Sequence, residues 1–209
     1  TYDKNDSLTE NGVYQVNEIS KYLCKIPFNF AFTSPVKRTK LSAEPTLKKI
    51  GLTSSELDWA SEDFAFFNFN EEYEGSRRWI FVIPKYLETF KKYKDKTNKE
   101  MYEDPLLKTT KIKMIQETVD NGIDEWIKTL GFIHDRNNHK YNFKNHVADN
   151  VIIFAHQGIS TFIFSSLLDM CYAKFRLTYP LLDCASISVF DIEEKTGIIT
   201  LEKFNEIKY

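Results

Sequence analysis

The sequence lacks an excess of charge of either sign: 28 lysine and arginine residues face 30 aspartate and glutamate residues, for a net charge of −2. A protein that binds nucleic acid through its phosphates usually carries a clear basic excess. Long apolar runs are also absent, and none approaches the roughly 18 residues that a membrane span needs. Neither nucleic acid nor a membrane is therefore expected as a partner.

Cysteine is scarce, and the three that are present, Cys24, Cys171 and Cys184, are irregularly spaced. No C-x-x-C pair or Cys/His cluster gives a zinc signature. His134 and His139 have too few ligand-type neighbours to form a metal site. We expect reduced thiols in a cytoplasmic protein, and no metal or other cofactor.

The length of 209 residues, with 42% hydrophobic and 28% charged residues, is typical of a globular chain with a core of its own. The 17 phenylalanines and 11 tyrosines predict that this core is aromatic. We expect residues 1–209 to form a single α/β domain.

Two strand-loop-helix units lie near the ends of the chain. Thr9 is a good N-cap for a first helix that ends before Pro27, and alternating phenylalanines at residues 28–32 predict a strand. Ser34 followed by Pro35 predicts the start of a second helix, which runs toward Gly51 with a kink or break at its internal proline.

The second unit starts with the apolar run V-I-I-F-A at residues 151–155, which is typical of a strand covered on both faces. Gly158 separates this run from a largely apolar helix. Residues 186–192 and 198–204 are two further strands, which the intervening E-K-T-G joins as a hairpin.

Residues 66–148 differ from both units and read as an inserted, mostly helical cap over one end of a parallel sheet. Within this segment the apolar positions of residues 112–130 make one long amphipathic stripe, with a bend expected at Gly122.

The loops after the two predicted strands contain the candidate functional residues. In open α/β sheets ligands bind at the carboxyl ends of strands, where helix N-termini favour anions. Arg38 in a first helical turn offers two N–H donors to a phosphate. His156 at the end of the second strand offers a hydrogen bond or a proton. These residues predict two walls of one phosphate pocket.

Three segments resemble motifs of the histidine phosphatase superfamily, the phosphoglycerate-mutase-like enzymes. Residues 6–15, D-S-L-T-E-N-G-V-Y-Q, are similar to the family element D-x-x-L-T-x-x-G-x-x-Q. Residues 34–44, S-P-V-K-R-T-K-L-S-A-E, are similar to S-P-x-x-R-[AT]-x-x-[TS]-A-E, and residues 151–158 resemble the strand that ends in H-x-G. All three occur in the family's order, with the cap between the second and the third.

The resemblance implies roles for individual residues. Arg38 would bind the phosphoryl group, and His156 would stabilise charge on it as the second active-site histidine. The acid that protonates the leaving group would lie near residue 61; Ser61 cannot do this, so Glu62 is preferred narrowly over Asp63. No metal is implied, because cationic side chains neutralise the charge.

The family's nucleophile, a histidine in R-H-G at the end of a first central strand, has no counterpart here. The only histidines are His134, His139, His146 and His156. That strand would lie upstream of Thr1, and a sheet without it would leave buried backbone groups unpaired. We therefore expect an additional upstream segment; a gene fragment or a rearranged pseudoenzyme is the alternative.

Taken together, the resemblance implies a mostly parallel central sheet flanked by helices, and a phosphatase that acts on a small phosphorylated substrate through a phosphohistidine. A catalytically inactive phosphate-binding or scaffolding protein of the same fold, or a phosphomutase, is the alternative. The sequence indicates neither the substrate nor the oligomeric state.

Overall fold

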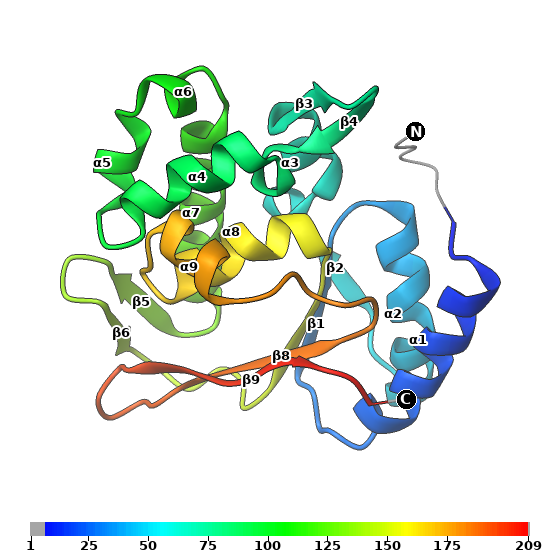
Figure 1. The fold of residues 1–209 in the computed structure, drawn as a ribbon. Coiled ribbons are helices and arrows are strands. Elements are labelled where there is room, and N and C mark those ends of the chain that lie inside the picture. The colour runs from blue at the N-terminus through cyan, green and yellow to red at the C-terminus, as the bar shows by residue number, and fades with distance from the viewer. Residues whose placement is uncertain (1–6, 209) are drawn as a thin grey trace.

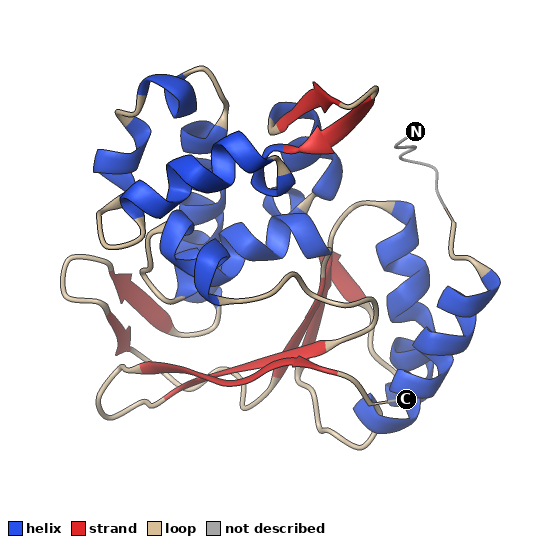
Figure 2. Cartoon of the chain, viewed as in Figure 1, coloured by secondary structure: helices blue, strands red, loops and turns tan. Residues whose placement is uncertain are grey.

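The computed structural model describes residues 7–208 and contains a three-stranded parallel sheet (Figure 1). Its strands are β1 (Phe30–Thr33), β2 (Ser54–Glu56) and β7 (Val151–Phe154). Their order is β2-β1-β7, so β1 is central. Figure 2 shows helices on both sides of the sheet. The flanking helices are α1 (Glu10–Leu23), α2 (Lys37–Ile50) and α8 (Gln157–Leu167). The predicted fold class is confirmed.

β7 is an outer strand of this sheet within residues 7–208, although its apolar sequence is typical of a covered strand. All four of its residues are only partly buried. Its second edge has no strand partner in the described part of the chain. The further central strand that the sequence analysis expects upstream of Thr1 lies outside the described residues, as does Asp6 of the first motif.

The first unit folds largely as its sequence predicts. Thr9 caps α1, since its Oγ1 accepts a hydrogen bond from the Gly12 N–H at 3.1 Å. α2 begins at Lys37, however, and not at Pro35, because Val36 is its N-cap. The helix also continues through Pro45 to a left-handed Gly51. The predicted break is wrong: one missing N–H in a 14-residue helix leaves the remaining ladder in place.

The segment between the two units is helical for the most part, but it contains two hairpins. The helices are α3 (Glu62–Asn68), α4 (Pro84–Tyr93), α5 (Asn98–Tyr102), α6 (Pro105–Lys108) and α7 (Ile112–Thr129), with 3-10 turns η1 (Asp58–Ala60) and η2 (Ile80–Val82). The hairpins are β3 (Asn70–Tyr73) with β4 (Ser76–Trp79), and β5 (Phe132–Asp135) with β6 (Lys140–Phe143). The predicted limits of an inserted cap at about residues 66–148 stay a prediction.

α7 carries the apolar stripe that the sequence predicts, and its buried face packs on α8. It is one helix with no interruption at Gly122. Gly122 has a packing role instead: a Cβ there would overlap the ring of Trp59. The core contains many aromatic side chains alongside aliphatic ones; the largest that are fully buried include Tyr141, Tyr172, Phe69, Phe81, Phe90 and Phe162.

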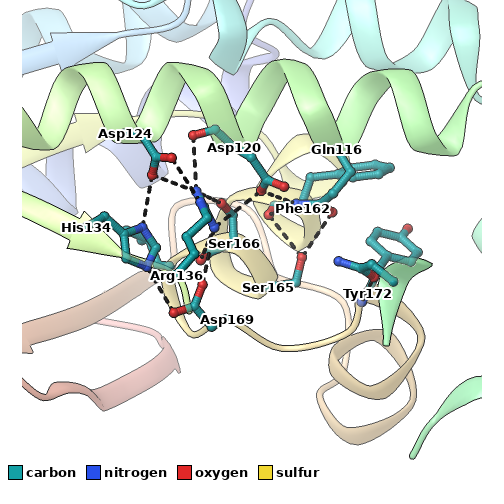
Figure 3. A network of polar contacts seen from close by, with 12 residues as sticks. Gln116, Asp120, Asp124, His134, Arg136, Phe162, Ser165, Ser166, Asp169 and Tyr172 are labelled. Carbon is teal, nitrogen blue, oxygen red and sulfur yellow. Dashed lines mark hydrogen bonds and ion pairs between the residues drawn. The ribbon is translucent and has the colours of Figure 1, made fainter. Parts of the chain in front are cut away.

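A polar cluster joins α7, the β5–β6 hairpin and the end of α8 (Figure 3). The buried ring of His134 places Nδ1 3.0 Å from Asp124 Oδ1 and Nε2 3.0 Å from Asp169 Oδ2. Arg136 donates to both carboxylates, at 2.8 Å and 3.2 Å. We call these four side chains the Asp–His–Arg cluster; it joins α7 and the β5–β6 hairpin to Asp169, which follows α8.

The chain ends in α9 (Tyr172–Thr178) and the antiparallel hairpin of β8 (Ile187–Ile192) and β9 (Ile199–Glu206). The predicted hairpin is confirmed, and Phe190 packs it against Phe164 of α8 with ring centroids 4.9 Å apart. None of the helices in residues 7–208 has the length and apolar character of a membrane span.

Candidate active site

The two predicted loops meet at the carboxyl ends of β1 and β7. These strands pair in parallel, with Thr33 opposite Phe154. The Ser34 N–H continues the ladder to the Phe154 carbonyl at 3.0 Å. Directly after these residues come the N-termini of α2 and α8, so both loops are held by neighbouring strands of one sheet. This is the arrangement that favours an anion site.

His156 lies between two hydroxyl groups of the first loop. Its Nε2 is 2.7 Å from Thr39 Oγ1 and 2.9 Å from Ser34 Oγ. Burial, with a smaller contribution from the Arg38 charge, lowers the pKa of His156 to about 3. The imidazole is therefore neutral at physiological pH, with one N–H to donate.

Thr39 is a site residue that the sequence analysis missed. It is buried, and it follows Arg38 in the second motif. Its partner His156 lies 117 residues away in the chain, so no local pattern could reveal the contact.

Arg38 stands in the first turn of α2, and its side chain is 21% exposed. Its guanidinium Nη1 lies 3.9 Å from Asp63 Oδ1. The arginine charge also acts on His156 and Glu62, where it lowers both pKa values. Arg38, His156, Glu62 and Asp63 thus come together in space, although 118 residues separate the first two in the sequence (156 − 38).

Glu62 is buried and uses both carboxylate oxygens at the N-terminus of α8. Oε1 accepts the Gly158 N–H at 3.1 Å and Oε2 accepts the Ile159 N–H at 2.9 Å. Burial raises the pKa of Glu62 to about 7, although the two amides and Arg38 pull it down. The helix N-terminus that the sequence analysis expected to bind phosphate therefore already carries an internal carboxylate.

Asp63 follows Glu62 but faces another way, toward Arg38. Its Oδ1 is buried and accepts no hydrogen bond from the described residues. At 3.9 Å from Arg38 it is close enough for Coulombic attraction and too far for a hydrogen bond. Of the two candidate acids, Asp63 is the one directly beside Arg38.

Trp79 at the end of β4 closes the other side of the α8 N-terminus. A Cβ on Gly158 would come within 2.5 Å of the Trp79 Cζ2, so only glycine permits this approach. Arg77 and Arg78 precede Trp79 on the same strand and are exposed. Arg77 donates to Asn70 Oδ1 at 2.6 Å.

The remaining histidines lie away from these loops. His134 belongs to the Asp–His–Arg cluster, His139 is 71% exposed, and His146 contacts Asp149 and Glu194. His156 is thus the one histidine of the 209 residues at the candidate site. In residues 7–208, no group of three or more His, Cys, Asp or Glu side chains is placed to hold a metal ion.

Comparison with known families agrees with the motifs. Residues 3–80, which contain the first two motifs, match the model of the histidine phosphatase superfamily (branch 1). No protein with a curated description matches the chain in sequence.

Solved structures share the fold over almost the whole chain. The α-ribazole phosphatase from Shigella flexneri has 17% identity, with a TM-score of 0.61 over 98% of this chain and 88% of that one. A mycobacterial glucosyl-3-phosphoglycerate phosphatase has 12% identity and a TM-score of 0.62 over 97% and 88%.

The phosphoserine phosphatase from Entamoeba histolytica, solved with 3-phosphoglyceric acid, has 15% identity and a TM-score of 0.60 over 97% and 85%. At such identities the likeness concerns the fold. Residues 3–80 thus resemble the histidine phosphatase superfamily (branch 1) in sequence, and almost the whole chain resembles solved phosphatases in fold.

Proposed function

We propose that the protein is a phosphomonoesterase that acts through a phosphohistidine intermediate. The observation that carries the proposal is the convergence of Arg38 and His156 at the carboxyl ends of two paired strands. Arg38 supplies a cation with parallel donors, and neutral His156 supplies an N–H to a phosphate oxygen. Both groups stabilise the charge of the transferring phosphoryl group without a metal.

The nucleophile in this proposal is a second histidine outside the 209 residues. The open edge of β7 is where a strand carrying it would pair, since that edge has no partner in residues 7–208. The histidine attacks phosphorus in line, so that a P–N bond forms while the P–O bond to the leaving group breaks. Water then hydrolyses the phosphohistidine and releases phosphate.

The leaving oxygen takes a proton, and two carboxyl groups compete for this role. A pKa near 7 suits a general acid, and on that criterion Glu62 is preferred. Geometry favours Asp63, because both oxygens of Glu62 are bound by amides while Asp63 faces Arg38. We assign the acid role to Asp63 in this proposal, because its carboxyl group lies beside Arg38, where the phosphate would bind.

The test uses the protein from its complete reading frame, assayed with p-nitrophenyl phosphate in the presence of EDTA. Arg38→Ala and His156→Ala are expected to lower kcat/KM by about 100-fold or more, as for other donors to a developing charge. Lys37→Ala, on the exposed neighbour of Arg38, is the matched control and should retain activity. Activity that survives both pocket substitutions contradicts the proposal.

A non-catalytic phosphate-binding protein of the same fold is the second candidate. The observation that favours it is the presence of a single histidine at the site. It predicts that inorganic phosphate binds in an Arg38-dependent way, while no turnover occurs and quenching in alkali, in which phosphohistidine is stable, yields no phosphohistidine. Turnover with a trapped phosphohistidine excludes it.

A further inference from the structure

Glu62 connects two helices that lie far apart in the chain. A helix N-terminus leaves its first N–H groups without intrahelical partners. At α8 the N-cap residue His156 makes no side-chain capping bond. The Gly158 and Ile159 N–H groups are instead bound by Glu62, 96 and 97 residues away.

The carboxylate itself is held rigidly. Glu62 is the first residue of α3, and Ser61 caps that helix by accepting the Phe64 N–H at 3.4 Å. The Glu62 side chain is buried, with only 6% of the residue exposed. Trp79 packs on Gly158, so both α3 and β4 contact the start of α8. The loop that carries His156 therefore depends on Glu62 for its position.

We propose that Glu62 is a positioning residue for the phosphate pocket: it orients the N-terminus of α8, and with it His156, and does not transfer the leaving-group proton. This inference rests on the proposed function of the same site. It also excludes one set of donors to the phosphate. The amides of Gly158 and Ile159 are engaged by Glu62, so phosphate is held by the Arg38 and His156 side chains.

The charge state of Glu62 bears on this role. Burial raises the pKa of its carboxyl group to about 7. A protonated carboxyl keeps one good acceptor and turns its O–H toward the second amide, so one of the two bonds to α8 is lost. The titratable groups that face Glu62 are Arg38 of α2, Asp63 of α3 and Tyr172 of α9. Both hydrogen bonds to α8 are thus present when Glu62 is ionised above pH 7, whereas the protonated form keeps one.

An NMR titration tests the positioning role without any need for activity. In the full-length protein, the amide protons of Gly158 and Ile159 should shift together between pH 5.5 and 8.5, with one midpoint near 7. In Glu62→Gln this titration should vanish, while Asp63→Asn should retain it. Amide shifts that do not titrate, or that titrate equally in Glu62→Gln, overturn the inference.

Kinetics with two leaving groups separates positioning from proton transfer. A nitrophenolate leaves without a proton, whereas an alkoxide needs one. If Glu62 positions the loop, Glu62→Gln lowers kcat/KM by the same factor for p-nitrophenyl phosphate and an alkyl phosphate. The loss of one charge-assisted hydrogen bond corresponds to about tenfold. A loss confined to the alkyl phosphate shows that Glu62 is the acid and overturns the inference.

The two experiments keep the proposals distinguishable. Amides that titrate as expected in a protein that neither binds nor hydrolyses phosphate would leave Glu62 as the cap of α8 and refute the proposed function. Hydrolysis that depends on Arg38 and is unaffected by Glu62→Gln would support the proposed function and refute the positioning role.

Discussion

Replacing Glu62 by glutamine should change how the stability of the protein depends on pH. The pKa of Glu62 is raised from 4.5 to about 7, so the folded state holds this proton more tightly than the unfolded chain. The resulting stabilisation is present below pH 4.5 and is lost as the pH rises toward 7. Between pH 5 and pH 8 the loss amounts to about 2.5 kcal/mol.

Glutamine does not titrate, so the difference in unfolding free energy between the wild type and Glu62→Gln isolates this contribution. Glutamine also places an NH₂ group against one amide of α8, but that cost does not vary with pH. Urea unfolding of both proteins at pH 5 and pH 8 gives the difference. On going from pH 5 to pH 8, the free energy of unfolding of Glu62→Gln should rise by about 2.5 kcal/mol relative to that of the wild type. This corresponds to about 5–10 °C in Tm for a chain of this size.

A difference that stays constant between the two pH values would refute the reasoning. It would mean that Glu62 titrates at its ordinary pKa, and that the two amides and Arg38 compensate fully for its burial. Asp63→Asn provides the control, since the neighbouring carboxyl group is less buried and should not reproduce the effect.

Two further predictions concern the cap. Gly122→Ala should lower the free energy of unfolding by about 1–3 kcal/mol, because overlap of the new Cβ with Trp59 outweighs a gain in helix propensity of about 1 kcal/mol. Gly12→Ala is the control: its Cβ would make contacts of 3.4 Å or more, so this substitution should be neutral or stabilising. His134→Gln should cost about 1–3 kcal/mol in thermal or urea unfolding, because the buried ring bridges Asp124 and Asp169 and the replacement loses at least one of these two contacts. The exposed His146→Ala should change little.

Much of the fold follows from local patterns in the sequence. The Thr9 cap marks the start of α1, and the 3.6-residue spacing of apolar side chains marks α7. The apolar run before His156 marks β7. These elements are predictable because their burial and their local chemistry point to the same structure.

The β3–β4 hairpin escaped prediction for a physical reason. Its strands have the sequences N-E-E-Y and S-R-R-W. Charged residues occupy adjacent positions and therefore lie on both faces of the hairpin, so the alternation of apolar and polar residues that predicts a strand is missing. The turn has positive φ at both Glu74 and Gly75, as a two-residue hairpin requires. Glu-Gly predicts a hairpin turn less strongly than Asn-Gly does, so the dipeptide does not mark this turn in the sequence.

The candidate site was predictable in part. Arg38 and His156 follow from strand ends and helix starts, and they come together as expected. The hydroxyl contacts of His156 and the amide contacts of Glu62 depend on how distant loops meet, and no local spacing encodes them. The start of α2 at Lys37 was likewise set by the strand pairing of Ser34, which overrode the preference of Ser-Pro for a helix start.

Phosphate binding at Arg38 and His156 is the central claim, and isothermal titration with inorganic phosphate at pH 7 tests it most directly. The wild type and Lys37→Ala should bind with similar affinity, whereas Arg38→Ala should weaken binding by at least about tenfold through loss of a charge-assisted contact. Binding that is absent in the wild type, or unchanged in Arg38→Ala, would contradict the claim.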